Sequence, residues 1–111
     1  MNKIIPSLLL VIATNVNADP TVNYFLENKS SAIVEAFVTG AGQGMITTNT
    51  MLKFKKSPQL FCPPPSLSIN YANLVSIIES EVKKQGVGVI GNEIVTPFLM
   101  MGFMSTFPCK K

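Results

Sequence analysis

Three consecutive prolines, Pro63–Pro65, restrict the fold of this chain more than any other feature of its sequence. Proline has no backbone N–H and a fixed φ angle, so a run of prolines follows an extended, polyproline-like path and cannot continue a helix. The stretch SPQLFCPPPSL, residues 57–67, is therefore predicted to be an extended linker within the domain. Helices are expected only before and after it.

The N-terminus has the pattern of a secretory signal peptide. Lys3 precedes an apolar stretch, residues 4–13, and residues 16–18 (VNA) match the small-x-Ala motif that signal peptidase reads. Residues 1–18 are thus predicted to be removed, which leaves one exported domain, residues 19–111. A buried N-terminal helix is the alternative. No later segment has the roughly 20 apolar residues that a membrane span requires, so no membrane attachment is expected after cleavage.

The chain has only two cysteines, Cys62 and Cys109. Export places both in an oxidising compartment, where a disulfide between them is expected. Two free buried thiols are the alternative. A domain of this size has a thin core and gains stability from a covalent link of this kind.

The composition argues against an enzyme. The chain has no histidine, which is the commonest general base and metal ligand. A disulfide would leave no thiolate nucleophile, and Glu79 and Glu81, two positions apart on an expected helix, point to different faces. No catalytic residue, cofactor site or metal site is therefore expected. All nine cations are lysines, and lysine without arginine or paired aromatic residues does not indicate nucleic-acid binding.

The segment before the linker predicts one helix. Residues 31–45 repeat apolar side chains at steps of three and four, with Ser30 or Ser31 as the N-cap. The pattern fades through residues 47–54, where β-branched residues and asparagine weaken it. Residues 21–27 are expected to form either a short helix or an irregular arm.

The segment after the linker predicts two further helices. An amphipathic helix begins at Ser68 or Asn70 and ends before Gly86, and a last apolar helix runs from Glu93 or Pro97 to Phe107. No convincing strand pattern is present. The predicted fold class is therefore all-α, a small bundle of three to four helices stapled by one disulfide.

Three glycines alternate in VTGAGQGM, residues 38–45. A dinucleotide-binding loop requires G-x-G-x-x-G, and Met45 stands where the third glycine is needed, so this function is not expected. On a helix, Phe37, Gly40 and Gly44 share one stripe because steps of three and four return to the same face. We predict that another helix or an ordered segment approaches closely at Gly40 and Gly44, whereas Gly42 points elsewhere.

A glycine-rich segment follows the amphipathic helix. It is predicted to be a protruding loop consisting of Gln85, Gly86, Val87, Gly88, Val89, Ile90, Gly91 and Asn92. A free loop does not usually display apolar side chains. Its apolar residues therefore either contact a partner or fold back on the core.

Several motifs occur in an order that is similar to one known family. Phe37-x-x-Gly40-x-x-x-Gly44 comes first, FCPPPSLS with Cys62 follows, and TFPCKK with Cys109 ends the chain. Over residues 31–111 the chain resembles the Rap/Tai family of immunity proteins, which protect bacteria against type VI secreted peptidoglycan amidases. The glycine-rich segment 86–91 departs from any motif of that family and leaves the partner open.

The resemblance implies a periplasmic, all-helical protein, often dimeric, that inserts a loop into the active-site groove of a cognate amidase. On this hypothesis Val87, Val89 and Ile90 fill the groove, and Gln85 and Asn92 make polar contacts at its rim. The expected partners are the amidase and a second copy of the chain in a homodimer. A small envelope protein or an acid-stress chaperone without inhibitory role is the alternative.

Overall fold

The structure is a computed structural model and describes residues 19–66 and 68–110 of the 111-residue chain. The predicted signal peptide, residues 1–18, lies outside the described residues. The described part contains five helices and no strand: α2 (Val22–Glu27), α3 (Ala32–Phe54), α4 (Tyr71–Gln85), α5 (Val87–Ile90) and α6 (Thr96–Thr106). The predicted all-α fold is thus confirmed. None of these helices combines the length and the apolar character of a membrane span.

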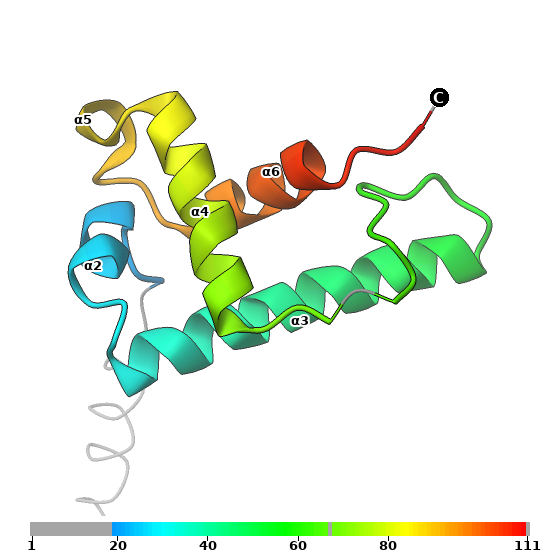
Figure 1. Ribbon diagram of the computed structural model, residues 1–111, viewed down its shortest axis with the longest axis horizontal. Coiled ribbons are helices and arrows are strands. Elements are labelled where there is room, and N and C mark those ends of the chain that lie inside the picture. Colours follow the sequence, from blue (N-terminus) through cyan, green and yellow to red (C-terminus); the bar gives the residue numbers. More distant parts are fainter. Residues whose placement is uncertain (1–18, 67, 111) are drawn as a thin grey trace, which may run out of the picture.

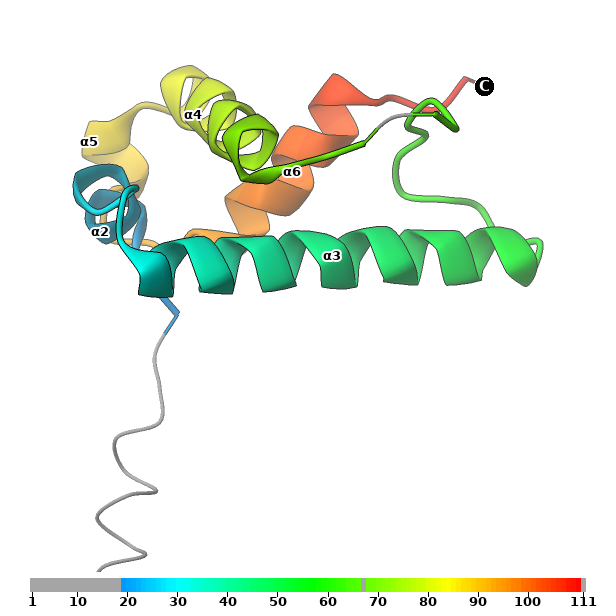
Figure 2. The same cartoon turned by 60° about the horizontal axis from the view of Figure 1, so that its bottom comes forward.

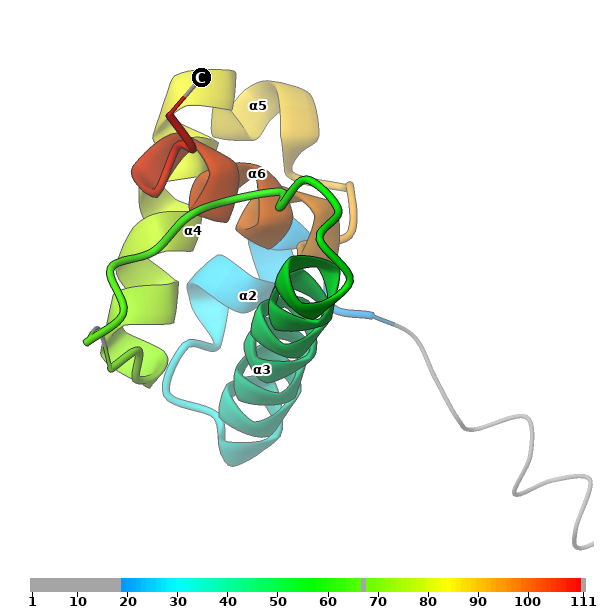
Figure 3. The same ribbon diagram turned by 90° about the vertical axis from the view of Figure 1, so that its right-hand side faces the viewer.

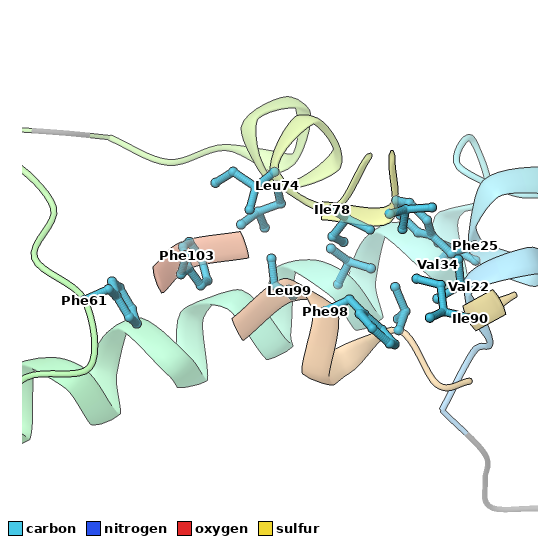
Figure 4. Packing of buried hydrophobic residues seen from close by; sticks show 14 residues of the cluster. Val22, Phe25, Val34, Phe61, Leu74, Ile78, Ile90, Phe98, Leu99 and Phe103 are labelled. Carbon is cyan, nitrogen blue, oxygen red and sulfur yellow. The ribbon is translucent and has the colours of Figure 1, made fainter. Parts of the chain in front are cut away.

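The long helix α3 forms one layer of the bundle (Figure 1). Figure 2 shows that α2, α4, α5 and α6 all lie on one side of it. Helices α4 and α6 pack against each other most extensively, and both also contact α3, as Figure 3 shows with the C-terminal end of α3 facing the viewer. Buried apolar side chains fill the space between the layers (Figure 4): Val22, Phe25, Val34, Val38, Phe61, Leu74, Ile77, Ile78, Val82, Ile90, Val95, Phe98, Leu99 and Phe103.

Side-chain caps begin two of the predicted helices where the sequence suggested. The Ser31 hydroxyl accepts a hydrogen bond from the Val34 N–H at 3.5 Å. Asn70 and Asn73 cap each other reciprocally, because each side-chain oxygen accepts from the other residue's backbone N–H, at 2.9 and 3.0 Å. These bonds satisfy N–H groups that have no partner within the helix.

Helix α3 is longer than predicted. It continues without a break through residues 47–54, where the sequence pattern fades, and ends at Phe54. Lys56 then takes a left-handed conformation with φ of 58°, and the Ser57 N–H donates to the Leu52 carbonyl at 2.9 Å. Helix propensity is a weak preference that tertiary contacts can override. In α3 the tertiary contact is the hydrogen bonding of Asn49 to the linker.

Asn49 is a buried polar residue that binds the linker backbone at two points. Its side-chain oxygen accepts from the Leu60 N–H at 2.8 Å and from the Phe61 N–H at 3.2 Å. Its amide donates to the Phe61 carbonyl at 2.7 Å. The linker cannot form helical hydrogen bonds of its own here, and Asn49 replaces them.

The predicted disulfide between Cys62 and Cys109 is confirmed, with the two Cα atoms 4.9 Å apart. The Cys62 N–H also donates to the Phe107 carbonyl at 2.7 Å. Next to this bridge the rings of Phe61 and Phe103 stack, with centroids 4.8 Å apart (Figure 4). The linker is therefore held to α3 by Asn49 and to the C-terminal segment by the disulfide.

The start of the last helix lies between the two predicted starts. Helix α6 begins at Thr96 with Val95 as its N-cap, and Pro97 lies in its first turn. No side chain caps its N-terminus. Proline suits this first turn because the N–H that it lacks would have no partner there.

The predicted helix contact at Gly40 and Gly44 is wrong within the described chain. Both glycines are exposed, and a Cβ atom built on either would meet nothing within 4 Å. The buried glycine of α3 is Gly42, where a Cβ would lie 3.0 Å from a methyl carbon of Leu74. Phe37 is only partly buried at the edge of the core. Helix α3 has apolar or small residues on two faces, and the bundle uses the face with Val34, Val38 and Gly42.

Candidate functional site

The glycine-rich segment forms a short helix instead of the predicted loop. Gln85 is the last residue of α4, Gly86 takes a positive φ of 90°, and residues 87–90 form α5. Glycine suits this position because a φ of this sign is costly for other residues. In Figure 1, α5 lies at the end of the molecule next to α2.

Only two of the three predicted groove-binding residues are accessible. Val89 is 81% exposed and Val87 is 46% exposed, whereas Ile90 is 6% exposed and belongs to the core. The predicted role of Ile90 as a contact residue is therefore wrong, because the single turn of α5 directs this side chain inward (Figure 4). Gly88 is open to solvent between the two valines.

Backbone hydrogen bonds hold α5 and the segment after it against α2. The Asn23 N–H donates to the Gly91 carbonyl at 2.9 Å, and the Val22 N–H donates to the Glu93 carbonyl at 2.8 Å. Gly91 is buried so tightly that a Cβ would lie 2.6 Å from the Asn23 side chain. The two exposed valines are thus carried by a fixed turn and not by a free loop.

The polar ends of the predicted loop have contacts within the chain. The Gln85 amide donates to the Glu81 carboxylate at 3.0 Å. The Asn92 side-chain oxygen accepts from the Asn23 amide at 3.5 Å, in an exposed position. The Gln85 side chain is therefore engaged by Glu81 within α4. Asn92 is an exposed polar side chain at the edge of the α5 surface.

Glu81 is a buried carboxylate, and the sequence did not indicate its burial or its partners. It is 4% exposed and also accepts from the Ser105 hydroxyl at 3.3 Å and from the Lys84 ammonium at 3.2 Å. The Gln85 hydrogen bond, with help from Lys84 and Ser105, lowers the pKa of Glu81, and burial acts in the opposite direction. The ionised carboxylate therefore links α4 to α6.

Replacing Glu81 by glutamine should remove a pH-dependent part of the stability. Because the folded-state pKa lies below the ordinary glutamate value of about 4.3, this contribution is present above that pH and is lost as the pH falls through the folded-state pKa. The difference in unfolding free energy between wild type and Glu81→Gln, measured with urea, should shrink from about pH 6 to about pH 3. The exposed Glu93→Gln variant is the control. A difference that does not change with pH would contradict the role of Glu81.

No three histidine, cysteine or acidic side chains gather around one point anywhere in residues 19–66 and 68–110. Glu79 forms an ion pair with Lys29, with 2.6 Å between the charged atoms, and Glu81 lies in its own cluster. The turn of α5 is one exposed apolar feature of this end of the molecule.

A second apolar feature lies on the other side of α2. An open hollow of about 410 Å³ lies between α2 and the first turns of α3. It is lined by Asp19, Pro20, Thr21, Tyr24, Ile33, Val34 and Phe37. The sequence offered no signal for it, because its walls come from segments that meet only in the folded chain.

No protein-family model, no curated protein and no solved structure matches this chain.

Proposed function

We propose that this chain is a periplasmic immunity protein that binds a secreted peptidoglycan amidase and covers its active-site groove. The observation that carries the proposal is the pair of exposed valines on α5, Val87 and Val89. The motif resemblance to the Rap/Tai family supplies the class of partner. The predicted signal peptide supplies the compartment in which such an amidase acts.

The proposed contact surface is ordered before binding, unlike a flexible loop that becomes ordered only in the complex. The turn is already anchored by Ile90 in the core and by the hydrogen bonds of Gly91 and Glu93 to α2. A contact surface that is ordered before binding loses less conformational entropy when the complex forms. The two valines enter the groove as a fixed knob, with Asn92 at its edge.

Burial of the two valines accounts for a large share of the binding free energy in the proposed complex. A fully buried valine contributes about 1.5 kcal/mol or more, and a few apolar anchors usually carry most of the binding energy. Gly88 separates the valines and lets a groove wall approach the backbone, because no side chain stands there.

Replacing Val87 and Val89 by serine in one variant should weaken inhibition about 100-fold. The assay is release of stem-peptide fragments from purified peptidoglycan by any secreted amidase found to be encoded next to this gene, titrated with the mature protein. The matched control is Leu60→Ser with Met104→Ser, since both side chains are 44–45% exposed and lie outside α5. Circular dichroism should show the same helix content in all three proteins.

Two results would contradict the proposal. Wild-type protein that does not inhibit this amidase would remove the proposed function. Equal loss of inhibition in the two double variants would mean that α5 is not the contact surface.

A further inference from the structure

The C-terminal end of α3 carries exposed apolar side chains between lysines. Phe54 is 76% exposed, and Met51, one turn earlier on the same side of the helix, is 49% exposed. Lys53 and Lys55 are both exposed and lie about 100° to either side of Phe54, because an α-helix has 3.6 residues per turn. Lys56 follows at the end of the helix. We call these five residues the basic end patch.

The described part of the fold leaves the apolar residues of the basic end patch uncovered. The buried residues of α3 lie on another face, from Val34 to Asn49. In Figure 2 the other described helices lie along that inner side of α3. The lysines alone are what a solvated helix end requires, since cations suit a helix C-terminus. Two large apolar side chains exposed next to each other have no such explanation and indicate a contact surface.

The segments that form this end of the molecule have no aspartate or glutamate. The sequence contains no acidic residue between Glu35 and Glu79 and none after Glu93. The salt bridges among the described residues use Lys29 and Lys84. The lysines of the basic end patch therefore form no ion pair with an acidic side chain of residues 19–66 or 68–110.

The disulfide adds a further lysine to the same end. It fixes Cys109 on the linker, and the exposed Lys110 follows directly. Leu60, on the linker, adds an apolar side chain that is 45% exposed. Figures 1 and 2 show the end of α3, the linker and the C-terminal segment at one end of the molecule and α5 at the other. This end thus combines positive charge with exposed apolar area.

We propose that the basic end patch binds the surface of a bilayer rich in anionic phospholipid. Phe54 and Met51 insert among the headgroups, and the lysine ammonium groups lie at the lipid phosphates. Apolar area and attraction to anionic lipid add in a contact of this kind. A lysine can keep its ammonium at the phosphates while its aliphatic stem lies along the apolar region.

The type of cation favours a lipid surface over a partner with fixed carboxylates. The chain has no arginine, so every cation of this end is a lysine. Arginine presents a planar fork that matches one carboxylate or phosphate in a set geometry, whereas lysine acts as a mobile, hydrated point charge. Mobile point charges suit the diffuse negative potential of a bilayer, to which each lysine near the surface contributes.

The proposed contact is peripheral and needs no spanning helix. The sequence-based expectation of no membrane attachment considered only segments long enough to cross a bilayer. The proposal does not rest on the proposed function, because the valines of α5 lie at the other end of the molecule (Figure 1). A molecule bound through the basic end patch leaves α5 facing away from the lipid.

Cosedimentation of the mature, disulfide-bonded protein with lipid vesicles tests the charge. The protein should bind vesicles that contain phosphatidylglycerol and should not bind vesicles of phosphatidylcholine alone. Lys55→Gln should weaken binding about fivefold. Lys83→Gln, at an exposed lysine on α4, is the matched control and should change it less than about twofold. Raising the salt from about 0.1 M to about 1 M shortens the Debye length from about 10 Å to about 3 Å and should release the protein.

Tryptophan fluorescence tests the insertion of Phe54. The chain has no tryptophan, so a single substitution supplies the only indole. The emission of Phe54→Trp should move to shorter wavelength on phosphatidylglycerol vesicles. Ile33→Trp should show no shift, because Ile33 is 81% exposed at the other end of the same helix.

Serine variants at the same two positions measure the apolar contribution. Phe54→Ser should weaken vesicle binding about tenfold or more, whereas Ile33→Ser should leave it unchanged. Both side chains are mostly exposed, so the thermal midpoints of the two variants should match that of wild type.

Three results would overturn the proposal. The first is wild-type protein that stays in the supernatant with phosphatidylglycerol vesicles at about 0.1 M salt. The second is an equal emission shift for tryptophan at positions 33 and 54. The third is binding to soluble polyglutamate that is as tight as binding to vesicles and insensitive to Phe54→Ser, which would assign the lysines to an acidic polymer.

Discussion

Replacing both Cys62 and Cys109 by serine should lower the free energy of unfolding by about 4 kcal/mol. The bridge joins positions 47 residues apart, and a cross-link over a loop of this length restricts the unfolded chain strongly. The total stability of a small domain is about 5–15 kcal/mol, so the variant should be marginally folded. Guanidinium unfolding of wild type and of the double-serine variant, followed by circular dichroism, measures the difference.

Wild type unfolded in the presence of a thiol reductant is the control for this experiment. It should match the double-serine variant, because both lack the bridge. A difference below about 1 kcal/mol between oxidised and reduced wild type would show that the linker holds its position without the disulfide.

Replacing Asn49 by alanine should lower the free energy of unfolding by about 3 kcal/mol or more. The change removes three hydrogen bonds and leaves the buried N–H and carbonyl of Phe61, together with the N–H of Leu60, without partners. Each buried polar group that loses its partner costs about 1–3 kcal/mol. Urea unfolding of the variant and of Thr50→Ala, an exposed neighbour on the same helix, makes the comparison.

Two further variants sharpen the test of Asn49. Asn49→Asp should recover part of the loss, because its carboxylate can still accept from the two N–H groups but cannot donate to the Phe61 carbonyl. Asn49→Ala combined with loss of the disulfide should lower the free energy of unfolding by less than the sum of the two separate losses, because both interactions fix the same linker. Additive effects would mean that the two attachments act independently.

Local sequence patterns were sufficient to predict most of the scaffold. Ser31 and Asn70 are N-caps in the structure, and the step of three and four predicts that α4 is amphipathic. The prolines predict the extended linker because their covalent structure excludes a helix. The cysteines are the only two in the chain, so each had one possible partner within it.

The candidate surface on α5 was predictable only in part. Alternating glycine and valine signalled an unusual apolar segment, and Val87 and Val89 are indeed accessible. The sequence could not distinguish a loop from a turn of helix in so short a segment. Nor could it show that Ile90 is buried, because its burial depends on the position of α2, which is far away in the sequence.

The amino-acid sequence by itself determined where α3 and α4 begin, where the linker must be extended and which cysteines pair, because these depend on covalent geometry and neighbouring residues. Tertiary structure decided which face of α3 is buried. That helix has apolar or small residues on two sides, and only the positions of α4 and α6 place Gly42 inside and Gly40 and Gly44 outside. It also decided how far α3 extends, because the hydrogen bonds of Asn49 to the linker form only when residues 11–12 positions apart in the chain come together.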